Sequence, residues 1–185
     1  VPAKRPSTPL VSIVVPMFNE QHGIGSLLEL LQEVLSPLDT RYEIVCINDG
    51  SSDGTLETLR GWQARLPTLK VIDLSRRFGK EAALTAGLEY SCGDAVVPFD
   101  ADLQDPAELI PEMIRLWRDG AEVVLARRAD RRSDSFMKRN SARLFYRMHN
   151  SISELQIPDD VGDFRLMDRR VVEAYLGKPR GGTAC

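Results

Sequence analysis

The chain has 185 residues, of which 43% are hydrophobic and 28% are charged, and its formal net charge at pH 7 is −3. A chain of this length is expected to form one well-buried core, because it is too short for two domains of ordinary size. No apolar run approaches the roughly 20 residues that span a bilayer, and no charged start followed by an apolar block resembles a signal peptide, so we expect a soluble chain.

The residue pattern predicts a short leader followed by alternating strands and helices. Residues 1–10 contain three prolines and are expected to form a flexible leader. The expected strands are 11–16, 42–48, 69–74, 94–99 and 121–126, and the expected helices are 24–35, 53–65, 80–91 and 106–118. The strands are nearly continuous in apolar residues, which is typical of a parallel sheet covered on both faces. The sequence therefore predicts a doubly wound α/β fold in a single domain.

Polar residues follow every expected strand, at the end where ligands bind in open parallel sheets. The five segments are PMFNE, NDGSSDGT, SRRFGK, DADLQDP and RRADR. Two common phosphate-binding devices are excluded. The segment GIGSLL places Leu28 where a GxGxxG motif needs its third glycine, and no GxxxxGK[ST] occurs, which argues against a dinucleotide dehydrogenase and a P-loop NTPase.

The segment DADLQDP crowds three aspartates after the fourth expected strand. In an extended chain Asp100 and Asp102 point to one side, and Gln104 follows them if the extension persists. Two or three such oxygen ligands suit Mg²⁺ or Mn²⁺ bound together with a diphosphate. Asp105 precedes Pro106 and is expected to cap the next helix. A lone DxD is a weak signal, and the alternative is a turn whose acids only cap that helix.

The segment NDGSSDGT places Asp49 at the end of the second expected strand. Gly50 and Gly54 allow tight backbone turns close to a ligand, and a carboxylate at this place can accept hydrogen bonds from a nucleobase imide or a ribose hydroxyl. Ser51, Ser52 and Asp53 are expected to cap the following helix, as they would in any turn between a strand and a helix.

Residues 127–147 carry eight Lys or Arg against two Asp. From Met137 to Met148, apolar or small residues recur at helical spacing along one stripe, while Arg139, Arg143 and Arg147 form another. This pattern predicts an amphipathic helix whose basic face meets anions, such as lipid headgroups. The alternative is an ordinary solvated helix face.

These motifs together resemble a known enzyme family. In order, VSIVVPMFNE, INDGSSDGT, SRRFGKEAALTAGLE, FDADLQDP, a basic segment ending in FYR, and GDFRLMDRR are similar to the inverting GT-A glycosyltransferases that load a sugar onto a polyprenyl phosphate. Dolichyl-phosphate mannose synthase and the bacterial undecaprenyl-phosphate glucosyltransferases are members. The resemblance runs from about residue 10 to about residue 176, and it implies a Rossmann-like GT-A catalytic domain over 11–176 with a helical DFRLM segment.

The resemblance also implies roles for individual residues. Pro16, Asn19 and Glu20 would lie beside the nucleotide, and Asp49 would read its base. Asp100 and Asp102 would be the DxD pair, with Asp102 most directly on Mg²⁺ or Mn²⁺ and Gln104 as a further ligand. Lys80 would face the nucleotide phosphates, although a solvent-exposed lysine at a helix start accounts for it equally well. Arg127, Arg131 and Lys138 would clamp the lipid phosphate, and Asp163, with Arg165 beside it, would be the proposed catalytic base.

The chemistry of the acceptor qualifies the role of Asp163. A phosphate monoester has a second pKa of about 6, so its oxygen is already largely deprotonated at neutral pH. Such a nucleophile scarcely needs a base. We therefore expect Asp163 mainly to orient the acceptor or its arginines.

The expected reaction transfers a sugar from a nucleotide-diphosphate sugar, with UDP-glucose favoured and GDP-mannose next, to a polyprenyl phosphate at the inner, cytoplasmic face of the membrane. No nucleic-acid partner is expected, and the sequence leaves open whether the chain forms a homo-oligomer. Three alternatives remain: a receiver-like signalling module, a sugar nucleotidyltransferase and a nucleotide-sugar-binding module. A receiver would need a lysine in the loop RRADR, and a nucleotidyltransferase usually has a basic, glycine-rich loop in place of the acidic PMFNE.

Family members generally continue beyond the last motif, and many bacterial ones add two membrane-spanning helices. We therefore expect a C-terminally truncated catalytic domain, with residues 177–185 as a polar tail. The three cysteines, Cys46, Cys92 and Cys185, form no CxxC pair and no evident zinc site. They favour a reducing, cytosolic setting.

Overall fold

The computed structural model describes residues 5–126, 145–147 and 164–177. Its strands form a seven-stranded sheet in the order β3-β2-β1-β4-β7-β5-β6. The strands are β1 (Leu10–Met17), β2 (Arg41–Asn48), β3 (Leu69–Asp73), β4 (Ala95–Pro98), β5 (Val123–Ala126), β6 (Phe145–Arg147) and β7 (Arg165–Asp168). The helices are α1 (Ile24–Leu35), α2 (Thr55–Gln63), α3 (Lys80–Tyr90), α4 (Ile110–Arg118) and α5 (Arg169–Tyr175), with a 3-10 turn η1 (Ala107–Leu109) before α4.

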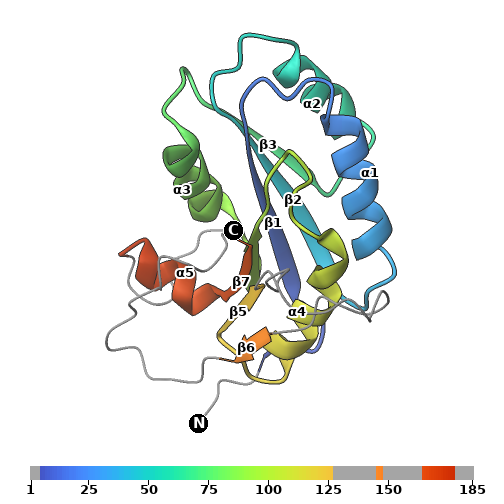
Figure 1. Ribbon diagram of the computed structural model, residues 1–185, viewed down its shortest axis with the longest axis vertical. Coiled ribbons are helices and arrows are strands. Elements are labelled where there is room, and N and C mark those ends of the chain that lie inside the picture. The colour runs from blue at the N-terminus through green and yellow to red at the C-terminus, as the bar shows by residue number, and fades with distance from the viewer. Residues whose placement is uncertain (1–4, 127–144, 148–163, 178–185) are drawn as a thin grey trace, which may run out of the picture.

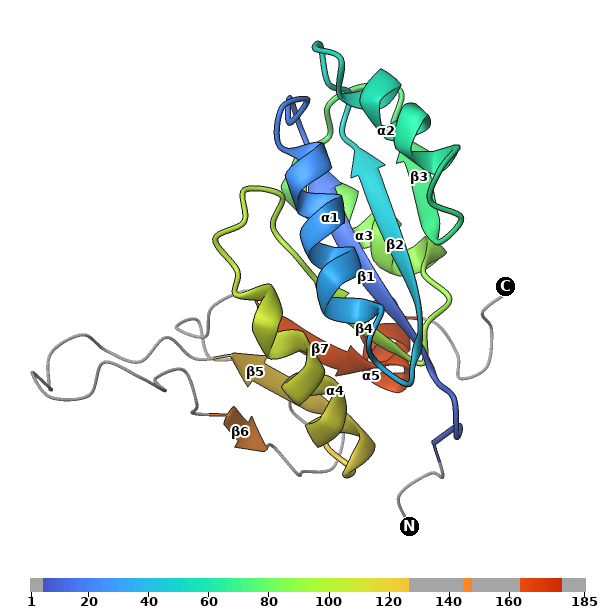
Figure 2. The same cartoon turned by 90° about the vertical axis from the view of Figure 1, so that its right-hand side faces the viewer.

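Helices cover both faces of the sheet, with α1, α2 and α4 on one side and α3 and α5 on the other (Figures 1 and 2). The central strand β1 shows why. Ile13 and Val15 belong to the larger core cluster, which also contains the buried residues of α1 and α4, whereas Val14 belongs to the cluster with α3 and α5. Side chains of a strand alternate between its faces, so a strand that is apolar throughout can be buried only between two layers of helices.

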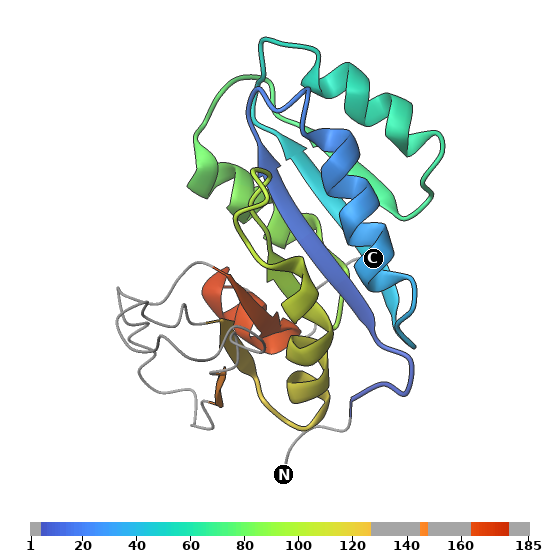
Figure 3. The same cartoon turned by 45° about the vertical axis from the view of Figure 1, so that its right-hand side comes forward.

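The sheet is parallel in one half and antiparallel in the other. Strands β3, β2, β1 and β4 are parallel neighbours. Strand β7 pairs antiparallel with both β4 and β5, and β6 pairs antiparallel with β5. The predicted α/β fold with a mostly parallel sheet is confirmed, and α1 and α4 lie along the same face of it (Figure 3). Among the described residues, no helix is both long and apolar enough to cross a membrane.

Two local predictions were wrong. The segment DFRLM was expected to be helical, but Arg165–Asp168 form strand β7, and the helix begins only at Arg169. Leu166 and Met167 are buried at adjacent positions, in the two different core clusters, as in a strand with both faces covered. Residues 145–147 form strand β6 rather than the end of a helix. The remainder of the predicted helix, Met137 to Leu144 and Met148, lies outside the described residues.

A buried charge cluster joins distant parts of the chain around Asp168. Its carboxylate accepts hydrogen bonds from Trp117 Nε1 at 2.9 Å and from Arg170 Nε at 3.0 Å. Arg5, within the stretch expected to be a leader, stacks 4.5 Å over the Trp117 ring and lies 3.4 Å from Asp168 Oδ2. Burial acts to raise the pKa of Asp168, but the hydrogen bonds from Arg170 and Trp117 outweigh burial and hold this pKa below its ordinary value. The cluster fixes β7 and the start of α5 against α4.

Replacing Asp168 by Asn should lower the free energy of unfolding at pH 7 by about 3 kcal/mol, because Arg5 and Arg170 lose a buried counter-charge. The pKa of the folded carboxylate lies below its ordinary value of 3.8. Its contribution is therefore complete above that pH and is lost as the pH falls through the lower, folded pKa. Urea unfolding at pH 7 and pH 3 measures both effects.

Glu122→Gln is the matched control, because Glu122 pairs with the same Arg170 at 3.2 Å but its side chain is 32% exposed. It should cost no more than about 1 kcal/mol. Equal losses in the two variants, or a loss for Asp168→Asn that does not shrink at low pH, would contradict this account.

Candidate functional site

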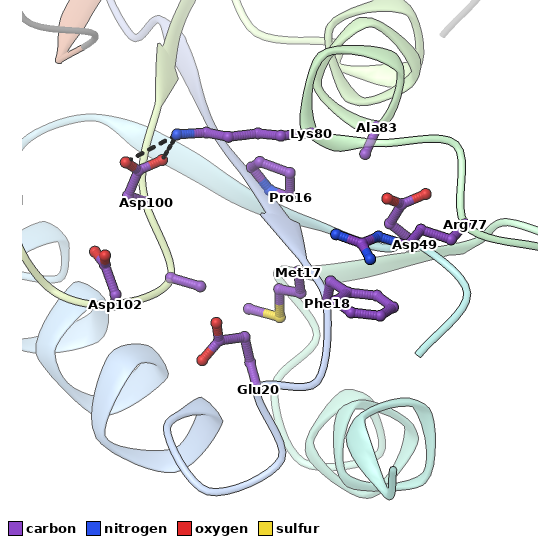
Figure 4. Close-up of a pocket in the computed structure, with 11 residues that line it drawn as sticks. Pro16, Met17, Phe18, Glu20, Asp49, Arg77, Lys80, Ala83, Asp100 and Asp102 are labelled. Carbon is purple, nitrogen blue, oxygen red and sulfur yellow. Dashed lines mark hydrogen bonds and ion pairs between the residues drawn. The ribbon is translucent and has the colours of Figure 1, made fainter. Parts of the chain in front are cut away.

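A cavity of about 210 Å³ opens at the carboxyl ends of the parallel strands. It lies where the loops after β1 and β4 diverge, which is the reversal point of the strand order and the usual ligand site of such sheets. The ends of four parallel strands and the segments after them line it (Figure 4). The lining residues are Pro16 and Met17 at the end of β1, Phe18 and Glu20 after it, Asp49 after β2, Arg77 after β3, Lys80 and Ala83 in the first turn of α3, and Asp100, Ala101 and Asp102 after β4.

The loops after β1 and β2 are tied to each other by side-chain hydrogen bonds. Asn19 adopts a left-handed conformation with φ of 57°, and its backbone N–H donates to Ser51 Oγ at 2.9 Å. Its side-chain Oδ1 accepts from the backbone N–H of Ser52 at 2.9 Å. Asn tolerates this backbone region better than most residues. These contacts occupy Asn19 in holding the two loops together, and it lines neither of the two cavities described in this part of the chain.

Asp49 fixes the loop that precedes α3. Its Oδ1 accepts from the backbone N–H of Phe78 at 2.7 Å, and its Oδ2 accepts from that of Gly79 at 2.8 Å. The residue is only 3% exposed. Gly50 has φ of 61°, and a Cβ at this position would lie 2.4 Å from the carbonyl carbon of Arg76, so only glycine permits this approach. The carboxylate predicted to read a nucleobase therefore also holds a neighbouring loop in place.

Arg77 and Phe18 form one side of the cavity. The Arg77 guanidinium lies 4.1 Å from the centroid of the Phe18 ring, in cation–π stacking. Figure 4 shows this pair and Asp49 on the side opposite Asp100 and Asp102. The sequence analysis missed both Arg77 and Phe18. Their only signal was their position after a strand end, in SRRFGK and PMFNE.

Lys80 and Asp100 form an ion pair across the cavity (Figure 4). Lys80 Nζ lies 2.7 Å from Asp100 Oδ1 and 3.0 Å from Oδ2. Asp102 lines the same cavity, but the chain turns after Asp100 and Leu103 has φ of 60°. The prediction of an extended DADLQ segment was therefore wrong. Gln104 lines neither cavity, and its backbone N–H donates to Asp102 Oδ1 at 3.2 Å.

Asp105 closes the acidic turn instead of capping a helix. Its Oδ2 accepts from the backbone N–H of Asp100 at 3.2 Å, and no side chain caps the following 3-10 turn. The prediction of an N-cap at Asp105 was therefore wrong. By contrast, Asp53 Oδ1 accepts from the N–H of Thr55, the first residue of α2, at 3.0 Å. Burial raises the pKa of Asp105 above its ordinary range, and the nearby charges of Asp100 and Asp102 add to the rise.

A second, smaller cavity of about 40 Å³ lies beside the first and shares Pro16, Lys80 and Asp100 with it. Arg165 of β7 lines this cavity, and its buried Nε has no hydrogen-bond partner in the described part of the chain. A guanidinium with unused donor capacity suits an anionic ligand. Arg165 was predicted to lie on the acceptor side of the site. The structure places it beside Asp100, in the lining of the same smaller cavity.

The acidic side of the larger cavity fits a divalent cation only in part. Asp100 and Asp102 offer the carboxylate oxygens that Mg²⁺ and Mn²⁺ prefer. Among the described residues, no three His, Cys, Asp or Glu side chains converge on one point as a complete cage would require. A cation bound here would take its remaining ligands from water and from a substrate, as Mg²⁺ commonly does.

The structure thus gathers six of the predicted site residues around one cavity: Pro16, Glu20, Asp49, Lys80, Asp100 and Asp102. Asn19 and Gln104 line neither cavity, and Arg165 lines the smaller one. The other four predicted residues, Arg127, Arg131, Lys138 and Asp163, lie outside the described ranges.

Comparison with known sequences identifies relatives over most of the chain. Residues 12–176 match the family model of glycosyl transferase family 2. An uncharacterised glycosyltransferase of Synechocystis is 48% identical over 169 residues, which are 91% of this chain and 53% of that protein. The bactoprenol glucosyl transferase of Shigella phage SfV is 47% identical over 163 residues, 88% of this chain and 53% of that protein. The chain therefore spans about half the length of these curated relatives.

Solved structures share the fold. A mannosyltransferase from Pyrobaculum calidifontis, in complex with GDP-Man and Mn²⁺, is 29% identical with a TM-score of 0.57, over 64% of this chain and 35% of that one. The 1–349 fragment of S. aureus TarS is 16% identical with a TM-score of 0.63, over 89% of this chain and 48% of that one. The expected GT-A fold is confirmed.

Replacing Asp49 by Asn should lower the free energy of unfolding by about 1.5–3 kcal/mol, because an amide can accept only one of the two backbone hydrogen bonds and loses the charge that strengthens both. The amides of Phe78 and Gly79 should also exchange hydrogen faster, which native-state exchange measured by NMR detects. Asp39→Asn, the same change at an exposed carboxylate, should stay within about 0.5 kcal/mol of wild type. Unchanged protection at Phe78 and Gly79 would show that Asp49 does not hold this loop.

Proposed function

The chain belongs to glycosyl transferase family 2, and from this premise we propose that it transfers a sugar from a nucleotide-diphosphate sugar to a polyprenyl phosphate. Family membership makes the protein a glycosyltransferase. The observation that carries the finer proposal is the cavity between β1 and β4, where Lys80, Asp100 and Asp102 lie together at the strand ends. A site of this kind suits a diphosphate bound with a divalent cation.

Glucose from UDP-glucose is the favoured donor sugar, and mannose from GDP-mannose is the next. Several relatives at 46–47% identity are named bactoprenol glucosyl transferases or their homologues. The mannosyltransferase from Pyrobaculum calidifontis, crystallised with GDP-Man and Mn²⁺, is a more distant relative. The same Mn²⁺ complex supports Mg²⁺ or Mn²⁺ as the cofactor of this protein.

The proposed reaction is a single in-line displacement at the anomeric carbon. An oxygen of the lipid phosphate forms the new bond to this carbon as the bond to the donor diphosphate breaks. The electron pair leaves with the nucleoside diphosphate, and the anomeric configuration inverts. A phosphate dianion needs to lose no proton in this step, so the chief requirements are proximity and charge compensation.

The residues of this chain divide those tasks between two sides of the cavity. On the donor side, Lys80 lies where it can compensate diphosphate charge, and Pro16, Glu20 and Asp49 border the space for the nucleoside. A bound Mg²⁺ or Mn²⁺, held by Asp100 and Asp102, would stabilise the departing diphosphate. On the acceptor side, Arg165 lines the adjoining cavity. We propose that Arg127, Arg131 and Lys138 bind the lipid phosphate, and that Asp163 orients the acceptor or these basic residues.

The acceptor also implies a place for the reaction. A polyprenyl phosphate keeps its tail in a bilayer, so transfer would occur at a membrane surface, and we propose its inner, cytoplasmic face. The basic segment 127–147 would favour anionic headgroups there.

The proposal is tested by titrating the protein calorimetrically with UDP and GDP, each with and without Mn²⁺, and then assaying turnover with a polyprenyl phosphate. We expect UDP to bind more tightly than GDP, and Mn²⁺ to strengthen both. Asp102→Asn should reduce turnover by about 100-fold or more, since several kcal/mol of charge stabilisation depend on the cation. Arg131→Ala should chiefly raise KM for the lipid.

Asp119→Asn, a change in the exposed ion pair with Arg115 at the end of α4, is the control and should leave turnover unchanged. Tight UDP binding without transfer to any polyprenyl phosphate would favour a nucleotide-sugar-binding module. Formation of a sugar nucleotide from a sugar phosphate and a nucleoside triphosphate would favour a nucleotidyltransferase.

The role of Asp163 is tested by a pH–rate profile of Asp163→Asn. An orienting residue predicts a large loss of activity that is equally deep at every pH between about 6 and 8.5, because the acceptor is already ionised over most of that range. A general base predicts a loss concentrated at low pH, where the acceptor keeps its proton. The second result would overturn the orienting role.

A further inference from the structure

We propose that Lys80 is an exchangeable counter-ion, which neutralises Asp100 before the donor binds and moves to the donor diphosphate when the donor enters, leaving Asp100 to the cation. This inference rests on the proposed function and adds a mechanism by which nucleotide and divalent cation bind as a coupled pair.

The first observation is the geometry of the ion pair. Lys80 Nζ lies within 3.0 Å of both carboxylate oxygens of Asp100. An ammonium ion at this place uses both oxygens of one of the two candidate cation ligands in the cavity. A divalent cation that takes Asp100 as a ligand would need one of those oxygens at about 2.1 Å, which a lysine ammonium in the same position hinders. Cation and Lys80 therefore compete for Asp100.

The second observation is that Lys80 is fixed at its backbone but open at its side chain. It is the first residue of α3 and follows Gly79, whose N–H is held by Asp49 and whose φ is 100°. Its side chain is 50% exposed, and that of Asp100 is 32% exposed. A partly exposed ion pair is weak, so Lys80 can exchange Asp100 for another anion by a change of rotamer, without a change in the fold.

The third observation is the balance of charge around the cavity. Four carboxylates line the cavity, those of Asp100, Asp102, Glu20 and Asp49. Two basic groups line it, those of Lys80 and Arg77. Asp105 lies just behind Asp100 and binds its backbone N–H. Without a ligand, Lys80 reduces the repulsion among these carboxylates. A diphosphate brings more negative charge than one carboxylate, so it is the stronger partner for the ammonium once it enters.

The fourth observation is the lack of a complete cation cage. The described residues include no third acidic, His or Cys ligand converging with Asp100 and Asp102. A cation that arrives alone would displace Lys80 and gain few ligands from the described residues in return. A cation that arrives with a diphosphate gains phosphate oxygens, while the same diphosphate accepts Lys80. Nucleotide and cation should therefore strengthen each other's binding, by the same factor in both directions.

The test compares wild type, Lys80→Met and Lys80→Arg by two binding measurements that do not depend on turnover. Free Mn²⁺ is followed by electron paramagnetic resonance during titration without nucleotide, and UDP binding is followed by calorimetry without metal. For Lys80→Met we expect Mn²⁺ to bind about threefold more tightly, because an exposed ion pair no longer competes. We expect UDP to bind about tenfold more weakly, because the charge-assisted hydrogen bond to the diphosphate is lost. Lys80→Arg keeps the charge and should remain close to wild type for Mn²⁺.

Arg77→Met is the matched control for the general electrostatic field. It removes one positive charge from the same cavity, but the Arg77 guanidinium stacks on Phe18 instead of pairing with Asp100. Mn²⁺ binding without nucleotide should change less in Arg77→Met than in Lys80→Met. If Mn²⁺ binding changed equally in the two variants, the loss of one positive charge from the cavity would explain the effect. That result would overturn the proposed exchange of Lys80 between Asp100 and the diphosphate. Circular dichroism checks that each variant is folded.

The remaining outcomes separate this inference from the proposed function. If wild type binds UDP with Mn²⁺ and Lys80→Met binds both ligands as wild type does, the exchange is wrong and the proposed function stands. If Mn²⁺ binding tightens but UDP binding is unchanged, Lys80 competes with the cation without moving to the diphosphate, and the exchange is again wrong. If wild type binds neither UDP nor GDP with Mn²⁺, the proposed function fails and the inference fails with it.

Discussion

The hydrogen bonds from the Phe78 and Gly79 amides to one buried carboxylate, Asp49, are the constraint on which the candidate site depends. Parallel strands bring their carboxyl ends to one edge, but the connections that follow them are free to diverge. Asp49 joins the end of β2 to the connection before α3, and Asn19 joins the connection after β1 to the one after β2. The first residue of α3 and the stacked Arg77 are thereby set in place before any ligand arrives. The site is preorganised at its backbone and adjustable at its side chains.

The electrostatics of the cavity follow from the substrates that the protein is proposed to bring together. Donor diphosphate and acceptor phosphate are both anionic, yet the charged residues that line the larger cavity are four carboxylates and only two basic groups. An acidic wall is compatible with an anionic donor only when a cation stands between them. Lys80 and Arg77 line the larger cavity as well, and Arg165 lines the adjoining one.

Much of the fold was predictable because its strands are apolar on both faces, and that pattern has few explanations other than a covered parallel sheet. The strand ends also identified Asp49, Asp100 and Asp102, since position along the chain was enough to place them at one edge, whereas Glu20 and Lys80 were inferred from the resemblance to a known family. Predictions failed where the outcome depended on partners distant in sequence. The sequence around Leu166 and Met167 is compatible with either a helix or a strand. Pairing with β4 and β5 on either side decides for a strand. Asp105 accepts a hydrogen bond from the backbone N–H of Asp100 instead of capping a helix. Arg77 stacks on Phe18, which lies 59 positions earlier in the sequence.

The place of β7 in the sheet has a consequence for the way the protein is made. Strand β7 lies between β4 and β5, although it follows β5 by about forty residues in the chain. During synthesis, the first four strands and their helices can assemble as soon as they leave the ribosome, but β5 has no route into the sheet until residues 165–168 emerge. The nascent chain therefore exposes the edge of β4 for the seconds in which that stretch is translated.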